Sequence, residues 1–321
     1  MTLSTVTVVG AGRMGAGIAQ VFALAGLDVT IADVSPEAAG DALDQLVWEA
    51  GEFEAQGLFP EGSADLVGRH VTTAESIPDS VQDADFIVEA VFERVDVKHD
   101  VLATISQHAR ADAIIATNTS TIPVKDLAPA VVGPERFLTA HFIYPAPFIP
   151  GVELVRGEAT TEETLEAVED LLTFCGKQHA RVADAPGMVM NRLQHAMIKE
   201  ACTLVDEGVA TIEDVDTIVR STFGVRLGFF GPFGMIDQGG LDIHAACYAT
   251  YERTLGERLA TPRLLKEAVE AGRLGVKNGQ GLRGTYDEQT ATELATYRNL
   301  AYARMSQLQQ ELGDAPDATR D

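Results

Sequence analysis

Cysteine is scarce in this chain of 321 residues. Cys175, Cys202 and Cys247 lie far apart and form no C-x-x-C pair. This spacing argues against a disulfide framework and against a zinc site, so we expect no metal and a cytoplasmic location. Apolar runs are too short for a membrane span. The first predicted strand begins by Thr5, so we expect no signal peptide.

Basic residues are also few. The chain has 24 basic residues, only 6 of them lysine, against 48 acidic residues, and its net charge is −24. A surface of that sign repels nucleic acid and anionic membranes, so neither is an expected partner. Adaptation to high salt is an alternative explanation of the acidity. Apolar residues make up 46% of the chain, which is enough for one large or two ordinary domains.

A glycine-rich turn follows the first predicted strand, residues 5–9. Gly10 permits a tight turn, Gly12 lets the backbone approach a pyrophosphate, and Gly15 lets the next helix pack close to the strand. The N-terminus of that helix would present free N–H groups to phosphate. Asp33 ends the second predicted strand, where a carboxylate binds the ribose hydroxyls of NAD and repels the 2′-phosphate of NADP. The pattern therefore predicts an NAD site.

Strand and helix alternate in residues 1–184, the predicted NAD-binding domain. Further apolar runs predict buried strands at residues 27–32, 86–90, 113–116, 136–141 and 152–155. Amphipathic helices are expected at 95–109 and 161–174, and a helical hairpin at 36–68. Repeated βα units favour an α/β fold with a Rossmann-like, mostly parallel sheet.

The pattern changes after residue 184. Residues 188–207 have helical periodicity, and residues 211–214 resemble a helix cap and first turn. Helices continue to about residue 310, and the polar residues 313–321 are expected to fray. We therefore predict that residues 185–321 form a smaller all-α domain.

His141 and Glu153 are the candidates for chemistry. His141 ends a predicted strand, and Glu153 lies in the next short strand after a proline-rich loop. Adjacent strands could bring the carboxylate onto the imidazole. Histidine can accept a hydroxyl proton while hydride leaves the same carbon, and a carboxylate on the far ring nitrogen would fix the tautomer. A purely structural histidine is the alternative.

These motifs resemble those of the 3-hydroxyacyl-CoA dehydrogenases over nearly the full chain. In the first domain, the matching positions are residues 10–15, 88–93, Lys98, 118–120, 141–142, Pro145 and Glu153. In the second, they are residues 184–187, Asn191, Arg192, 231–234, Lys277, Gly279 and Gly281. The resemblance implies a Rossmann-like domain and a helical domain that binds substrate and forms a homodimer.

The resemblance also implies residue roles. His141 would be the general base, Glu153 its orienting partner, and Ser120 and Asn191 would contact the substrate. The predicted cofactor-binding residues are Gly10, Gly12, Arg13, Met14, Gly15, Asp33, Glu93, Lys98, Asn118 and Lys277. For two of these residues a structural role is the alternative. Lys98 could be a solvated lysine on a helix, and Asn191 could be a residue at a helix start.

The implied activity is NAD-dependent oxidation of a 3-hydroxyl to a 3-keto group in fatty acid metabolism, with an L-3-hydroxyacyl-CoA such as 3-hydroxybutyryl-CoA as substrate. Two features depart from the family. Tyr144 stands where the family usually has asparagine. Residues 34–68 contain eight acids and no lysine or arginine, whereas CoA-using members are basic there. An acidic hairpin should repel the CoA phosphates.

Other functions remain open. Relatives with this fold oxidise small free hydroxy acids such as gulonate, carnitine and pyridine carboxylates, and residues 148–155 and 239–243 look somewhat like theirs. We rank the thioester first and a free hydroxy acid second. A 3-hydroxyisobutyrate- or 6-phosphogluconate-type dehydrogenase would use a catalytic lysine, such as Lys98 or Lys199. A non-enzymatic nucleotide-binding or structural protein is the most remote alternative. The pair of His141 and Glu153 argues against both of these.

We predict that the protein binds NAD more tightly than NADP. The carboxylate of Asp33 would repel the 2′-phosphate of NADP and accept hydrogen bonds from the ribose hydroxyls of NAD. Titration of the protein with each cofactor measures the two dissociation constants. A lower dissociation constant for NADP would contradict the role of Asp33.

Overall fold

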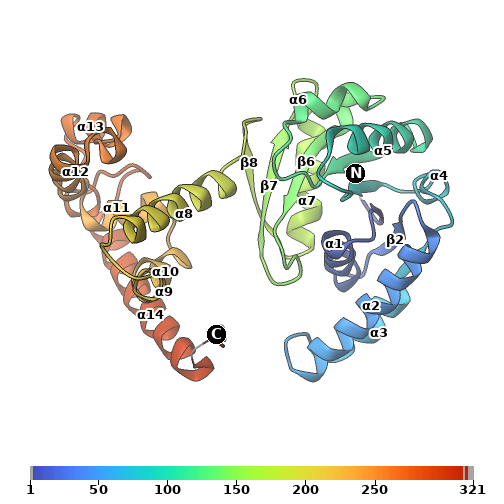
Figure 1. Cartoon of the computed structure of the whole chain (residues 1–321), viewed down its shortest axis with the longest axis horizontal. Coiled ribbons are helices and arrows are strands. Elements are labelled where there is room, and N and C mark those ends of the chain that lie inside the picture. Colours follow the sequence, from blue (N-terminus) through green and yellow to red (C-terminus); the bar gives the residue numbers. More distant parts are fainter. Residues whose placement is uncertain (1–2, 314, 317–321) are drawn as a thin grey trace. The chain divides into compact units, whose positions relative to one another are not determined.

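The computed structural model describes residues 3–313 and 315–316, so most of the predicted frayed end lies outside the described residues. The chain divides into two compact units, Met1–Ile198 and Lys199–Asp321. Within the described residues, the first unit contains an eight-stranded sheet (Figure 1). Its strands are β1 (Thr5–Val9), β2 (Asp28–Ala32), β3 (Val71–Thr73), β4 (Phe86–Glu89), β5 (Ile114–Thr117), β6 (Phe137–Phe142), β7 (Gly151–Arg156) and β8 (Gln178–Val182).

The strand order is β3-β2-β1-β4-β5-β6-β7-β8. Neighbouring strands are parallel except for β6 and β7, which are antiparallel. The predicted α/β fold with a mostly parallel sheet is therefore confirmed. The two edge strands, β3 and β8, were not predicted, because they are short or mostly exposed and lack the apolar run that marks a buried strand.

Helices cover the sheet of the first unit. They are α1 (Arg13–Leu24), α2 (Pro36–Ala55), α3 (Ser63–His70), α4 (Ile77–Ser80), α5 (Val95–His108), α6 (Val124–Leu127) and α7 (Glu162–Phe174), with 3-10 turns η1 (Ala128–Ala130) and η2 (Pro134–Arg136). The helices α2 and α3 form the predicted hairpin and lie side by side (Figure 1). Ser35 caps α2 and Thr161 caps α7, each by accepting a hydrogen bond from a backbone N–H three residues on.

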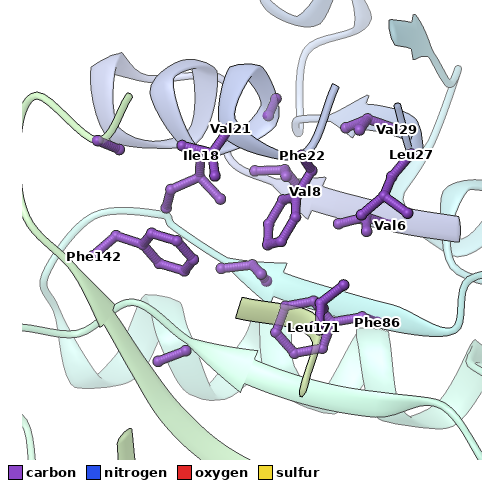
Figure 2. Packing of buried hydrophobic residues seen from close by; sticks show 14 of the residues in the cluster. Val6, Val8, Ile18, Val21, Phe22, Leu27, Val29, Phe86, Phe142 and Leu171 are labelled. Carbon is purple, nitrogen blue, oxygen red and sulfur yellow. The ribbon is translucent and has the colours of Figure 1, made fainter. Parts of the chain in front are cut away.

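Aromatic packing ties α1 to the sheet. The ring of Phe22 on α1 lies 5.9 Å from the ring centroids of both Phe86 on β4 and Phe142 on β6, edge to face in each case. Figure 2 shows these rings within the cluster of buried side chains between the helix and the strands. Because Phe142 adjoins His141, the same core fixes both the helix that follows the glycine turn and the candidate base.

The second unit is helical. The helix α8 (Met190–Asp206) runs across the division of the chain and is followed by α9 (Ile212–Ser221), α10 (Phe223–Leu227), α11 (Pro232–Gly239), α12 (Leu241–Leu255), η3 (Gly256–Leu259), α13 (Arg263–Glu270), η4 (Val276–Asn278) and α14 (Glu288–Leu312). The predicted cap is confirmed, because the Thr211 hydroxyl accepts a hydrogen bond from the Asp214 N–H at 3.1 Å. Among the described helices, none is long and apolar enough to cross a membrane.

Asp85, at the start of β4, anchors the start of β1. Its carboxylate accepts hydrogen bonds from the backbone N–H groups of Ser4 at 2.8 Å and Thr5 at 3.1 Å. Burial raises the pKa of this carboxyl, but these bonds outweigh burial and lower the pKa from 3.8 to about 2. The carboxylate therefore stabilises the fold above about pH 4, and this contribution is lost as the pH falls towards 2.

We predict that Asp85→Asn lowers the free energy of unfolding by about 2 kcal/mol at pH 7, since a pKa unit corresponds to about 1.4 kcal/mol. The loss should shrink as the pH falls from 4 towards 2. Urea unfolding followed by circular dichroism measures it. Asp83→Asn is the matched control, because Asp83 is an exposed neighbour and the charge change is the same. Equal losses in both variants, or a loss independent of pH, would contradict this role of Asp85.

Candidate active site

The glycine turn places three glycines under different constraints. Gly10 has φ +114°, and a Cβ there would lie 2.7 Å from the carbonyl oxygen of Ala90. A Cβ on Gly15 would lie 1.8 Å from the carbonyl oxygen of Gly10. The fold itself therefore requires glycine at both positions. Gly12 differs, since a Cβ there would have no atom of the described residues within 4 Å beyond the adjoining chain. The protein leaves the backbone of Gly12 accessible, which suits contact with a pyrophosphate.

Asp33 follows β2, and its carboxylate faces the glycine turn. Its oxygens accept hydrogen bonds from the N–H groups of Ala11 and Val34, each at 2.7 Å. Arg13 is exposed in the first turn of α1, and Met14 is half-buried against the core. The uncapped start of α1 and this acid meet at the carboxyl ends of β1 and β2. The residues present therefore fit a dinucleotide whose adenosine ribose carries no 2′-phosphate.

His141 and Glu153 form the predicted pair. They stand directly opposite each other in the antiparallel register of β6 and β7, so their side chains share one face of the sheet. The imidazole Nδ1 lies 2.8 Å from the carboxylate Oε2, and both residues are buried. Because Nδ1 is engaged, Nε2 is the ring nitrogen that can exchange a proton with a substrate.

The second oxygen of Glu153 is also held. Its Oε1 accepts hydrogen bonds from the backbone N–H groups of Val189 at 2.9 Å and Met190 at 3.0 Å, at the start of α8. The carboxylate thus bridges the imidazole of His141 and two backbone amides. Sequence reasoning did not anticipate this second set of partners, because a backbone N–H leaves no trace in residue type.

Asn118 and Asn191 each form a hydrogen bond to the backbone at or beside another candidate residue. Asn118 follows β5, and its Oδ1 accepts a hydrogen bond from the Phe142 N–H at 2.7 Å. Asn191 lies in the first turn of α8, as the structural alternative expected, and its Nδ2 donates to the Ser120 carbonyl at 3.1 Å. The predicted substrate contacts, Ser120 and Asn191, are therefore neighbours, and Asn118 is bonded to the residue that follows His141.

Lys98 lies in a buried ion pair rather than in solvent. It is 1% exposed, and its Nζ lies 2.7 Å from Glu89 Oε1 and 3.5 Å from Glu93 Oε2. The alternative of a solvated helix lysine is therefore wrong. Glu89 also accepts hydrogen bonds from the Val91 N–H at 2.7 Å and the Thr117 hydroxyl at 2.6 Å. We did not predict a role for Glu89, although an acid that ends an apolar strand was a visible clue.

Glu93 organises the loop that carries Ser120. Its Oε1 accepts hydrogen bonds from the hydroxyl of Thr119, the N–H of Ser120, and both the N–H and the hydroxyl of Thr121, at 2.7–2.9 Å. Burial raises the pKa of this carboxyl, but the Thr119 hydroxyl, the Lys98 charge and Thr121 together hold the pKa below its ordinary value. Glu93 is therefore an ionised anchor for this loop at neutral pH.

A cavity of about 570 Å³ lies between α1, α2 and the turn after β6. Tyr144 and Phe148 line it from the turn, Glu49 and Phe53 line it from α2, and Arg13 lines it from α1. The ring of Phe148 packs 5.0 Å from that of Phe53, which joins the hairpin to the turn. The hairpin thus places an acid beside the glycine turn and the residue that departs from the family pattern.

Lys277 belongs to the second unit. It forms an ion pair with Asp242, which lies in the first turn of α12. The nearby buried carboxylate of Asp237 accepts hydrogen bonds from the N–H groups of Leu282 at 2.7 Å and Arg283 at 3.0 Å. The predicted contact of Lys277 with the cofactor stays a prediction.

Family models match most of the chain. Residues 5–185 match the NAD binding domain of 3-hydroxyacyl-CoA dehydrogenase, and residues 187–284 match the C-terminal domain of the same enzyme. The chain belongs to the 3-hydroxyacyl-CoA dehydrogenase family. The family model for the first part thus agrees with a glycine turn and an acid that fit NAD.

Relatives within this family carry different printed activities. A probable 3-hydroxybutyryl-CoA dehydrogenase of Bacillus subtilis is 34% identical over 91% of this chain and 100% of its own. A 5-formyl-3-hydroxy-2-methylpyridine 4-carboxylate 5-dehydrogenase of Mesorhizobium japonicum is 33% identical over 90% of this chain and 93% of its own. A 3-hydroxyacyl-CoA dehydrogenase from Archaeoglobus fulgidus, known from a crystal structure, has a sequence 30% identical to this one. The match covers 97% of this chain and 99% of that chain, with a TM-score of 0.77.

We predict that Lys98→Met destabilises the first unit by about 3 kcal/mol, because it leaves the carboxylate of Glu89 buried without its counter-ion. Removing both charges in the double variant Lys98→Met, Glu89→Gln should restore most of the loss, since no uncompensated charge then remains buried. The glutamine oxygen can still accept the Val91 N–H, and its amide group can donate to the Thr117 hydroxyl. Urea unfolding measures the free energy of unfolding of both variants. If the double variant is no more stable than Lys98→Met alone, the ion pair is not the reason for the loss.

Proposed function

We propose that this protein catalyses the NAD-dependent oxidation of the 3-hydroxyl of an L-3-hydroxyacyl-CoA, of the 3-hydroxybutyryl-CoA type, to a 3-keto group. The observation that carries this proposal is the buried pair of His141 and Glu153 in the unit that also contains the glycine turn. The printed activity of the Bacillus subtilis relative supports the thioester. Such a reaction belongs to fatty acid metabolism, and we place it in the cytoplasm.

His141 is the general base of the proposed reaction. Its Nε2 accepts the hydroxyl proton, and Glu153 at Nδ1 holds the ring in that tautomer and stabilises the imidazolium that forms. Ser120 and Asn191 bind the substrate near the reacting carbon, where a hydroxyl and an amide offer both donors and acceptors. NAD, when bound, supplies the acceptor for the hydride that leaves this carbon.

We assign the cofactor to the residues that the family resemblance names. The glycine turn and the start of α1, with Gly10, Gly12, Arg13, Met14 and Gly15, are assigned to the pyrophosphate, which the backbone of Gly12 can approach, and Asp33 accepts hydrogen bonds from the ribose hydroxyls. Glu93, Lys98, Asn118 and Lys277 complete the proposed cofactor set. Since Lys98 is buried beside Glu89, we assign it an electrostatic influence through Glu93 rather than direct contact.

We propose that residues 1–184 bind NAD and that residues 185–321 bind the substrate and form the homodimer. Apolar side chains on the helices of the second unit support a homodimer: Ile212 and Ile218 on α9 are 66% and 59% exposed. Large exposed apolar side chains are common at subunit interfaces.

A small free hydroxy acid is the second candidate substrate. The acidic hairpin favours it, because Glu49 faces the cavity beside the glycine turn and would repel the phosphates of CoA. Tyr144 takes up room at the same cavity. The relative from Mesorhizobium japonicum, whose printed name is that of a pyridine carboxylate dehydrogenase, is about as similar to this chain as the thioester enzyme. Overall similarity therefore does not discriminate between the two substrate classes.

A comparison of substrates at saturating NAD tests the proposal. We expect NADH formation with 3-hydroxybutyryl-CoA at a higher kcat/KM than with 3-hydroxybutyrate, gulonate or carnitine. His141→Gln should lower kcat by about 100-fold or more, the size of a general base contribution, while the Kd for NAD stays within about twofold. Higher kcat/KM with a free acid would select the second candidate. Near-normal kcat in His141→Gln would refute the role of the base.

A further inference from the structure

One corner of the chain has a backbone conformation that its side chain disfavours. Met188 has φ +49°, and it is the one residue other than glycine with positive φ among those described. Gly187 before it has φ +74°. Residues with a Cβ rarely adopt this left-handed region. Such conformations persist only where the surrounding structure enforces them, and they are frequent at functional sites.

The structure enforces this corner from both sides. Before it, the carboxylate of Asp184 accepts hydrogen bonds from the N–H groups of Val124 at 2.9 Å and Lys125 at 3.0 Å. At the corner, the Met188 side chain is buried, with the residue 6% exposed, in the cluster that also contains Val124 of α6 and residues of β5, β6 and β7. A turn to right-handed φ would either withdraw this side chain from the core or redirect the chain that follows.

The chain that follows is the part that reaches the candidate site. The next two N–H groups, of Val189 and Met190, both point to Glu153 Oε1. One residue further, Asn191 reaches the Ser120 carbonyl. Three successive residues after Met188 therefore contact the orienting acid and the substrate-binding loop.

We propose that Met188 is a positioning residue for the base: its left-handed backbone aims two amides at Glu153 and so keeps the other carboxylate oxygen on His141. This inference rests on the proposed role of His141. The helix α8 starts at Met190 and runs to Asp206, past the division of the chain after Ile198. The corner therefore also joins the orienting acid to the helix that leads into the second unit.

The variants Met188→Leu and Met188→Ile form a matched pair that tests the positioning role of the left-handed backbone. Both new side chains have the volume of methionine and are fully apolar, but the β-branched side chain of isoleucine disfavours positive φ much more strongly. We expect kcat to be about tenfold or more lower in Met188→Ile than in Met188→Leu, because small misplacements of catalytic groups cost that much or more. The Kd for NAD should differ by less than about twofold between the two variants. Equal kcat values would overturn the proposal.

A second comparison separates positioning from a merely structural role. In a Glu153→Ala background, the amides have no carboxylate to hold, so replacing leucine by isoleucine at position 188 should change the residual kcat by less than about twofold. A full tenfold effect in that background would show that Met188 does not act through Glu153, and would overturn the proposal.

Should Met188→Ile fail to fold, Met188→Gly and Met188→Ala make the same test. Both remove the buried side chain, but only glycine adopts positive φ freely. We expect the glycine variant to retain the higher kcat, and the opposite order would overturn the proposal. If the unaltered protein oxidises no substrate of the panel, the proposed function fails instead, so the two failures are distinguishable.

Discussion

The carboxylate of Glu153 is the contact on which the rest of the candidate site depends. One oxygen lies 2.8 Å from the imidazole of His141, and the other accepts two N–H groups at the start of α8. A buried carboxylate needs such partners, because burial without them is costly. The same interaction therefore orients the imidazole of His141, gives the buried carboxylate its partners and ties the sheet to the helix that leads into the second unit.

A second buried network holds the loop that contains Ser120. Glu89 and Lys98 neutralise each other within the fold, and Lys98 lies close enough to Glu93 to favour its ionised form. Glu93 in turn holds the loop that contains Ser120 through four hydrogen bonds. Buried charges with complete partners make rigid networks. The loop that contains Ser120 is thus fixed by charges that need not touch a ligand.

The hairpin of α2 and α3 bears on what the site accepts. Its acids are incompatible with a phosphate-rich ligand held close to it, whereas the family resemblance favours a CoA thioester. Packing of Phe53 on Phe148 keeps this hairpin next to the turn after β6. A CoA thioester would therefore be accepted only if its phosphates extend into solvent, where their repulsion by the hairpin is screened, rather than lie against the hairpin.

The sequence by itself determined the cofactor pattern and the central pair. Gly10, Gly15 and Asp33 follow a spacing that can be recognised along the chain at a turn and a strand end, and His141 and Glu153 lie in strands whose apolar runs are visible. Only the tertiary structure decided the edge strands β3 and β8, the partner of Lys98 and the left-handed backbone at Met188. These features depend on pairing between distant segments and on the directions of backbone N–H groups, and neither is encoded by residue type or local spacing.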